Sequence, residues 1–179
     1  MALIELDEYY PNYRGEFPPG HNINNFDVIA RCDEKVGFVE NILVDENSGR
    51  FLYLVINTVF WILGKKILIP IGLAHIVYKE RHVYIETLTK EQVKKLPEFK
   101  GNLGIDGNYE ERVREIYRSS VTVKAVNQVH KSVASDYRQE PYFYEMTEQN
   151  HPKLKEYEER LSNIKKGFVS KVKNENDKS

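Results

Sequence analysis

The chain has 179 residues, enough for one domain with an extension or for two small domains. Hydrophobic residues make up 41% and charged residues 30%, a globular composition that excludes the disordered and fibrous classes. Twenty-six basic and 27 acidic residues give a net charge of -1, so no overall field directs the chain to nucleic acid or anionic lipid. The single cysteine, Cys32, excludes an internal disulfide and fits a reducing compartment, and we interpret it as a small apolar residue at a strand end.

The N-terminal region has no basic leader followed by an apolar run, and the longest apolar stretch, residues 51–63, is too short to cross a bilayer. We therefore expect no transmembrane segment and a cytoplasmic protein. Residues 1–23 mix Tyr9, Tyr10 and Tyr13 with several prolines, a composition that disfavours regular helix and central strand. This segment is predicted to be an irregular arm lying against the main body.

After the arm, short β-branched and aromatic runs alternate with turn residues, which is typical of consecutive antiparallel strands. The expected strands cover residues 27–30, 36–45, 51–58, 65–71, 75–78 and 82–86. The third of these is apolar at nearly every position, so both of its faces should be covered. Pro70 cannot donate a backbone hydrogen bond and should lie at an edge or at a strand end.

One strand departs from simple alternation. Val39 stands at odd spacing from Ile42 and Val44, so a strict period of two would place it on the opposite face. A β-bulge near Glu40 and Asn41 would bury all three side chains. The following Glu46-Asn47-Ser48-Gly49 predicts a hairpin loop, with the glycine able to take a positive φ.

Two capping boxes predict helices after the last strand. Thr89 with Gln92 begins a short helix that ends before Pro97, and Asn108 with Glu111 begins a second one. The second helix has an apolar stripe formed by Tyr109, Val113, Ile116 and Tyr117.

A further helix is predicted to begin at Pro152 and to end at Gly167. Its apolar positions recur at spacings of three and four, at Leu154, Tyr157, Leu161 and Ile164. The stripe either covers the predicted strands as a flap or forms a surface for a second copy of the chain, because it is too short for an independent coiled coil.

Residues 33–46 and 49–56, followed by 65–71 and 88–93, resemble the PRC-barrel family in sequence and in order. The resemblance implies a mainly β fold, a six-stranded antiparallel PRC-type β-barrel, here with a C-terminal helical extension. It also implies docking to larger assemblies such as photosynthetic reaction centres and ribosomal particles, without shared catalytic residues. The predicted organisation is an irregular arm at 1–23, a PRC-barrel domain at 24–100, a helical extension at 101–168 and a disordered tail at 169–179.

The C-terminal segment 146–160 is similar to the tail of stand-alone cyanobacterial PRC-barrel proteins. Together the two resemblances imply a non-enzymatic protein-binding or assembly adaptor linked to photosynthetic assemblies, with a homodimer as one form. The alternative is RNA or ribosome-particle binding in ribosome maturation. Its basic contributors would be Lys65, Lys66, Arg81, Lys94 and Lys95.

Catalytic and metal-binding patterns are missing from the sequence. None of the five histidines has a short metal-ligand spacing, and no phosphate-binding loop or nucleophile elbow occurs. The carboxylate pairs Glu110-Glu111 and Glu158-Glu159 are expected on exposed helix faces, where the charge is solvated. We therefore predict no enzyme, no metal and no cofactor, and a cleft between barrel and extension is the remaining enzyme hypothesis.

Phe60 and Trp61 stand beside Lys65 and Lys66. The tryptophan either closes one end of the barrel or forms an exposed docking edge, since aromatic residues next to basic ones are common at interfaces. The candidate partner-binding residues are Phe60, Trp61, Lys65, Lys66, Leu154, Tyr157 and Leu161.

Overall fold

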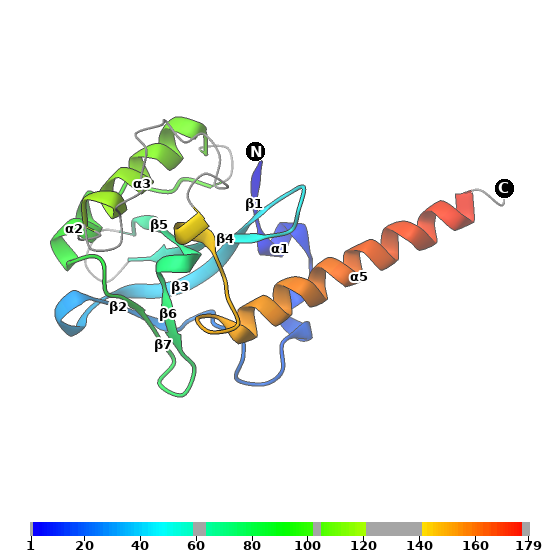
Figure 1. The fold of residues 1–179 in the computed structure, drawn as a ribbon, viewed down its shortest axis with the longest axis horizontal. Coiled ribbons are helices and arrows are strands. Elements are labelled where there is room, and N and C mark those ends of the chain that lie inside the picture. Colours follow the sequence, from blue (N-terminus) through cyan, green and yellow to red (C-terminus); the bar gives the residue numbers. More distant parts are fainter. Residues whose placement is uncertain (1, 59–63, 102–104, 121–140, 177–179) are drawn as a thin grey trace.

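The computed structural model describes residues 2–58, 64–101, 105–120 and 141–176 (Figure 1). Seven strands of this part form one sheet in the order β5-β4-β3-β2-β7-β6, and β1 pairs with β3 beside this path. The strands are β1 (Leu3–Glu5), β2 (Asp27–Ala30), β3 (Glu34–Asp45), β4 (Phe51–Asn57), β5 (Lys66–Pro70), β6 (His75–Val77) and β7 (His82–Ile85). Six of them agree with the predicted strands to within two residues, because each is marked locally by β-branched and aromatic residues.

The prediction of a closed, wholly antiparallel barrel is wrong in two respects. β2 and β7 pair in parallel, with Val28 opposite Val83. In the described part of the chain β5 and β6 are the terminal strands, so strand pairing does not close the sheet. The outer edge of β5 is used differently: the Phe99 amide donates to the Lys66 carbonyl (2.8 Å) and the Tyr117 hydroxyl donates to the Leu68 carbonyl (3.2 Å). Residues that follow β7 in the chain therefore cover this edge of the sheet.

Local features of β3 and its hairpin follow the prediction. The β3–β4 register shifts between Val39 and Asn41, and Val39, Ile42 and Val44 are all buried, so the predicted bulge is confirmed. Gly49 has φ +73° in the turn after β3. A Cβ there would lie 2.7 Å from the Tyr9 hydroxyl, so the residue is required both for its backbone conformation and for this close approach.

The N-terminal residues are more regular than predicted. Leu3 of β1 pairs with Asp45 of β3, and a short helix α1 (Leu6–Tyr9) and a 3-10 turn η1 (Tyr13–Glu16) follow. The side chains of Leu3, Leu6 and Tyr13 are buried, which fixes this segment against the sheet. The expectation of an irregular arm is wrong here, because a pairing partner about 40 residues away in the chain cannot be detected from three residues of sequence.

The remaining elements are α2 (Lys90–Lys95), α3 (Gly107–Ser120), α4 (Pro141–Tyr144), α5 (Pro152–Asn176), and the 3-10 turns η2 (Arg31–Asp33) and η3 (Ile71–Leu73). The capping box of Thr89 and Gln92 is confirmed. The second box is wrong, because Asp106 caps α3 by accepting the Tyr109 amide hydrogen bond at 2.7 Å. Gly167 does not end α5, since one glycine disfavours a helix by only about 1 kcal/mol.

The hydrophobic core lies around β4, whose residues from Phe51 to Ile56 are all buried. The predicted cover over this strand is confirmed: α3 and α4 supply Glu110 and Tyr144, whose side chains both contact the Tyr53 hydroxyl. Figure 1 shows α3 on one side of the sheet and α5 leaving it on another. Pro70 ends β5, as predicted.

Candidate docking surface

The ends of β4 and β5 form a polar surface with the neighbouring part of β3. We call Glu40, Asn57, Lys65 and Lys66 the β4–β5 end surface. One carboxylate oxygen of Glu40 pairs with the Lys66 ammonium, and the other accepts a hydrogen bond from the Asn57 amide at 2.7 Å. Because both partners of the ion pair are partly exposed, at 30% and 38%, the pair fixes side-chain geometry more than it stabilises the fold.

Lys65 connects this surface to α2. Its ammonium donates a 2.7 Å hydrogen bond to the carbonyl of Lys94 in the last turn of that helix. Partial burial lowers the pKa of Lys65, and the charge of Glu98 acts in the opposite direction. The side chain is therefore held in place by the end of a helix, where cations are favoured.

Phe60 and Trp61 lie outside the described residues. The residues that flank this segment are joined: the Thr58 amide donates to the Lys65 carbonyl at 3.0 Å. Thr58 is fully buried, so this end of β4 is anchored in the core. The chain between Thr58 and Lys65 thus starts and ends at the β4–β5 end surface.

The other predicted partner-binding residues lie at the opposite end of β4. Leu154, Tyr157 and Leu161 of α5 are buried against the rest of the chain. Tyr157 packs on Phe17 with the ring centroids 4.0 Å apart. On the same helix Glu158 accepts the hydrogen bond of the Phe51 amide, the first of β4, at 2.6 Å. At about 3.3 Å per residue, β4 separates the two groups by roughly 20 Å.

The environment of Glu158 differs from the expected solvated helix face. The residue was predicted on an exposed face, yet burial raises its pKa, and the bond from Phe51 acts in the opposite direction. Glu110, likewise expected to be solvated, is only 4% exposed and accepts a 3.0 Å hydrogen bond from Tyr53. Glu110 is buried and Glu158 is half-buried, because each accepts a hydrogen bond from a donor of β4, which lies far from it in the sequence.

A buried polar cluster joins α3 and α4 to the sheet. Tyr53 and Tyr144 share a 2.6 Å hydrogen bond between hydroxyls, and the fully buried Arg114 contacts Tyr144 at 3.4 Å and Glu111 at 3.2 Å. Burial raises the pKa of Tyr144 to about 12, and Arg114 acts against this rise. Sequence reasoning missed this cluster. The two tyrosines are visible in the sequences of β4 and α4, but only the fold shows that their hydroxyls converge.

The basic residues proposed for RNA binding are divided over the surface. Lys66 pairs with Glu40, and Lys94 pairs with Glu91 at 2.7 Å. Arg81 lies between β6 and β7, with its guanidinium 5.0 Å from the Phe26 ring centroid. Because phosphate binding needs a concentration of positive charge, this distribution gives the RNA alternative no specific support.

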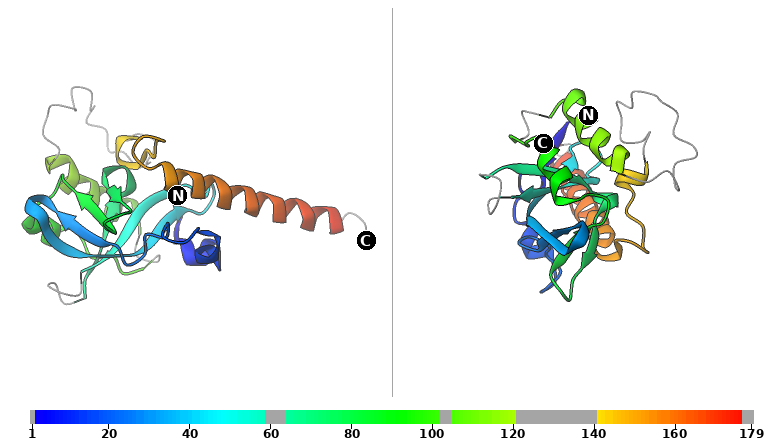
Figure 2. Two further views of the ribbon diagram at one scale, coloured as in Figure 1. Left: turned by 90° about the horizontal axis from the view of Figure 1, so that it is seen from below. Right: turned by 90° about the vertical axis from the view of Figure 1, so that its left-hand side faces the viewer.

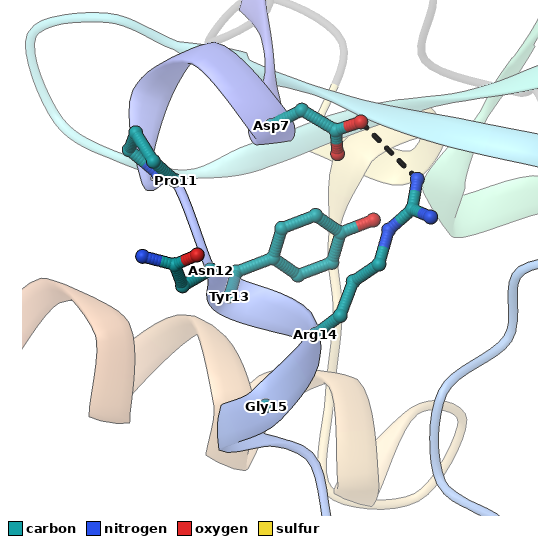
Figure 3. A pocket seen from close by; sticks show the side chains of 6 residues that line it. All are labelled: Asp7, Pro11, Asn12, Tyr13, Arg14 and Gly15. Carbon is teal, nitrogen blue, oxygen red and sulfur yellow. Dashed lines mark hydrogen bonds and ion pairs between the residues drawn. The ribbon is translucent and has the colours of Figure 1, made fainter.

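The N-terminal segment forms an open hollow of about 530 Å³, lined by Asp7, Pro11, Asn12, Tyr13, Arg14 and Gly15 (Figure 3). The guanidinium of Arg14 pairs with Asp7 at 3.2 Å, and both side chains are about half exposed. All of the lining comes from one short stretch of chain. The convergence of polar groups from several elements that is typical of a ligand site is not seen here.

The described residues contain neither a metal-ligand cluster nor a membrane-spanning helix. Within the described ranges, no group of three or more His, Cys, Asp or Glu side chains is arranged to hold a metal ion. No helix among them has the length and apolar character needed to cross a bilayer. Cys32 lies in η2, just after the end of β2, and it is exposed with φ +66°.

The strand order, the bulge in β3 and the capped helix α2 coincide with the segment that matches a known family. Residues 18–92 match the family model of the PRC-barrel domain. The match begins in the arm and ends inside α2, so it includes β2 to β7 and the whole β4–β5 end surface. A PRC-barrel domain indicates an adaptor or assembly role, and the family is generally non-enzymatic.

An uncharacterized protein of Deinococcus radiodurans is similar to this chain, with 32% identity over 69 residues. The match covers 38% of this chain and 24% of the relative. The chain therefore spans about a quarter of the length of the curated relative it matches, and the likeness concerns a domain-sized segment.

Proposed function

We propose that the protein is an assembly adaptor whose PRC-barrel domain binds another protein through the β4–β5 end surface and the adjoining Phe60 and Trp61. The observation that carries the proposal is the anchoring of the residues that flank Phe60 and Trp61. The Thr58 amide is hydrogen-bonded to the Lys65 carbonyl, and the Lys66 side chain is fixed by Glu40. A basic side chain that is already held loses little conformational entropy on binding, which favours affinity.

The proposal also concerns the identity of the partner protein. The resemblance to stand-alone cyanobacterial proteins supports a photosynthetic assembly, and the wider family supports a ribosomal one. A second copy of the chain is the other protein partner that we propose. The burial of Leu154, Tyr157 and Leu161 in their own chain supports the β4–β5 end surface, and not the α5 stripe, as the contact.

Site-specific photocrosslinking tests the proposal in the native host. A benzophenone amino acid replaces Trp61 or Lys65 in the full chain, and a matched chain carries it at Tyr142, a 58% exposed aromatic position in α4. We expect one protein to be crosslinked from positions 61 and 65 and not from 142. That protein, purified, should bind the unmodified chain, and Trp61→Ala should weaken binding at least about 10-fold, equivalent to about 1.4 kcal/mol.

The control is Tyr142→Ala, which should change the affinity less than about 2-fold. Circular dichroism and the melting temperature establish that both variants fold. Equal crosslinking from all three positions, or equal affinity of Trp61→Ala and the unmodified chain, would contradict the proposal. Crosslinks between two copies of the chain would identify the dimer as the assembly.

A further inference from the structure

α5 is held against the rest of the chain by only part of its length. Its N-terminal half buries Leu154, Tyr157 and Leu161, whereas its C-terminal half extends away from the sheet (Figures 1 and 2). Lys165 adds a contact near the middle of the helix, with its ammonium 3.4 Å from the Tyr9 ring centroid. We call the contact of residues 151–165 with the rest of the chain the α5 interface.

The α5 interface contains polar groups that are buried without a hydrogen-bond partner. The described residues include five such side-chain atoms, and three of them are here: the Tyr78 hydroxyl and both ring nitrogens of His151, which lie near the Ile71 and Ala74 backbone without the geometry of a hydrogen bond. Tyr78 belongs to the interface because the Lys153 ammonium lies 4.3 Å from its ring centroid. A buried polar group without a hydrogen bond has lost its water and gained no partner, so it offsets part of the apolar contact of α5.

His151 lies at the N-terminal end of α5, directly before Pro152. Its amide donates to the Thr147 carbonyl at 2.9 Å, and its carbonyl accepts from the Lys155 amide at 3.0 Å. The residue is 3% exposed. The N-terminal end of a helix carries partial positive charge, so a protonated imidazole is disfavoured in this position.

The charged and polar groups around His151 do not compensate for its burial. Burial lowers its pKa to about 4; the Ile71 and Ala74 carbonyls near η3 act in the opposite direction, and His75 of β6 lowers the pKa further. On its own helix, the first turn carries Lys153 and Lys155, which are also positive. The carboxylates of Glu145 and Glu148, before the helix, belong to exposed residues. The ring is therefore accommodated in its neutral form.

We propose that His151 makes α5 an acid-released helix: its ring is protonated only when the N-terminal half of α5 has left the rest of the chain. Release would expose the apolar stripe of α5 together with Phe17, which Tyr157 now covers. It would also free the Phe51 amide from Glu158. The protein would then present a second apolar surface at acidic pH, at the opposite end of β4 from the β4–β5 end surface.

The sign of the effect follows from proton linkage. Above pH 6.5, the ordinary pKa of histidine, the ring is neutral in both states and does not influence release. Below it the released state binds the proton first, so α5 binding weakens until the pH reaches about 4. At pH 5 the two values give a weakening of about 30-fold. Glu158 acts in the opposite sense, since its raised pKa favours the bound helix as the pH falls.

Hydrogen exchange of the full chain, measured by mass spectrometry at pH 7 and pH 5 and corrected for intrinsic rates, tests the proposal. We expect protection of residues 152–161 to fall about 30-fold, while β4 peptides change less than about 3-fold. In His151→Leu, which keeps the ring position apolar, the fall should be below about 3-fold. His21→Gln is the matched control, because His21 also contacts α5, with its Nδ1 3.0 Å from the Tyr157 hydroxyl.

Several outcomes would overturn the proposal. One is an equal loss of protection of residues 152–161 at pH 5 in His151→Leu and in the unmodified chain. Another is a loss that His21→Gln removes and His151→Leu does not. In the unmodified chain, unchanged protection of these residues, or an equal loss in the β4 peptides, would also overturn it. If His151→Leu does not fold, NMR of the His151 ring in the unmodified chain decides: titration near pH 6.5 with α5 still protected contradicts the proposal, and titration concurrent with loss of protection supports it.

Discussion

At the scale of single residues, buried polar side chains determine how the helices attach to the sheet. The hydroxyl of Tyr53 donates to Glu110 and shares a second hydrogen bond with Tyr144, and Arg114 lies beside both, 3.9 Å from the Glu110 carboxylate. A buried charge pair of this kind adds little net stability over an apolar replacement. Loss of one partner is costly, because the other charge stays buried.

Arg114→Met should therefore lower the free energy of unfolding by about 3–5 kcal/mol, because Glu110 would remain buried without the charge of Arg114. Urea unfolding followed by circular dichroism measures the change. Arg112→Met, the same substitution at an exposed position two residues earlier in α3, should change the stability by less than about 1 kcal/mol. Equal effects of the two substitutions would show that the cluster does not act as described.

At the scale of elements, the position of α4 depends on close backbone contact. α4 packs on η3 at Gly72, where a Cβ would lie 2.5 Å from the Tyr142 carbonyl oxygen and 2.8 Å from the Phe143 carbonyl. No larger residue fits without moving α4. The same contact brings Phe143 and Tyr144 into the core, so glycine at this position permits the cluster around Arg114 to form.

Gly72→Ala should destabilise the protein by about 1–3 kcal/mol and displace α4, since the added methyl group overlaps backbone atoms that cannot rotate away. Hydrogen exchange of residues 141–146, together with thermal unfolding, measures both effects. Gly15→Ala is the control, because a Cβ at that position would meet no atom within 4 Å beyond its own chain neighbours. Two results would contradict the packing argument: faster exchange of residues 141–146 in Gly15→Ala, or no increase in their exchange in Gly72→Ala.

At the scale of the whole molecule, the PRC-barrel domain is attached to segments on both sides. β1 pairs with β3 from the N-terminal side, and Glu158 binds the first amide of β4 from the C-terminal side. The boundaries at 24–100 stay a prediction. The core nevertheless includes Leu6 from before this range and Leu161 from after it, which favours one cooperative unit.

The full chain is accordingly expected to unfold in a single transition, with coincident curves from circular dichroism and tyrosine fluorescence. Deletion of residues 1–16 removes β1 and exposes part of the core. The melting temperature should fall by at least about 5 °C, since each kcal/mol corresponds to about 2–4 °C in a chain of this size. Two separate transitions, or an unchanged melting temperature after the deletion, would show that the arm is not part of the folding unit.

The local structure of the barrel domain and its family could be predicted from the amino-acid sequence alone. Strand periodicity, the bulge at Val39 and the capping box at Thr89 depend on neighbouring residues, so they can be recognised without knowledge of the fold. Only part of the candidate site could be predicted in this way. Lys65 and Lys66 do lie together, whereas the apolar stripe of α5 is buried in its own chain.

Features that depend on contacts between distant residues became visible only in the folded chain. The parallel pairing of β2 with β7 and the strand β1 follow from partners far along the chain. The burial of Glu110 depends on Tyr53, 57 residues before it, and the partial burial of Glu158 on Phe51. A carboxylate looks solvated in sequence, because its burial requires a donor that only folding places beside it.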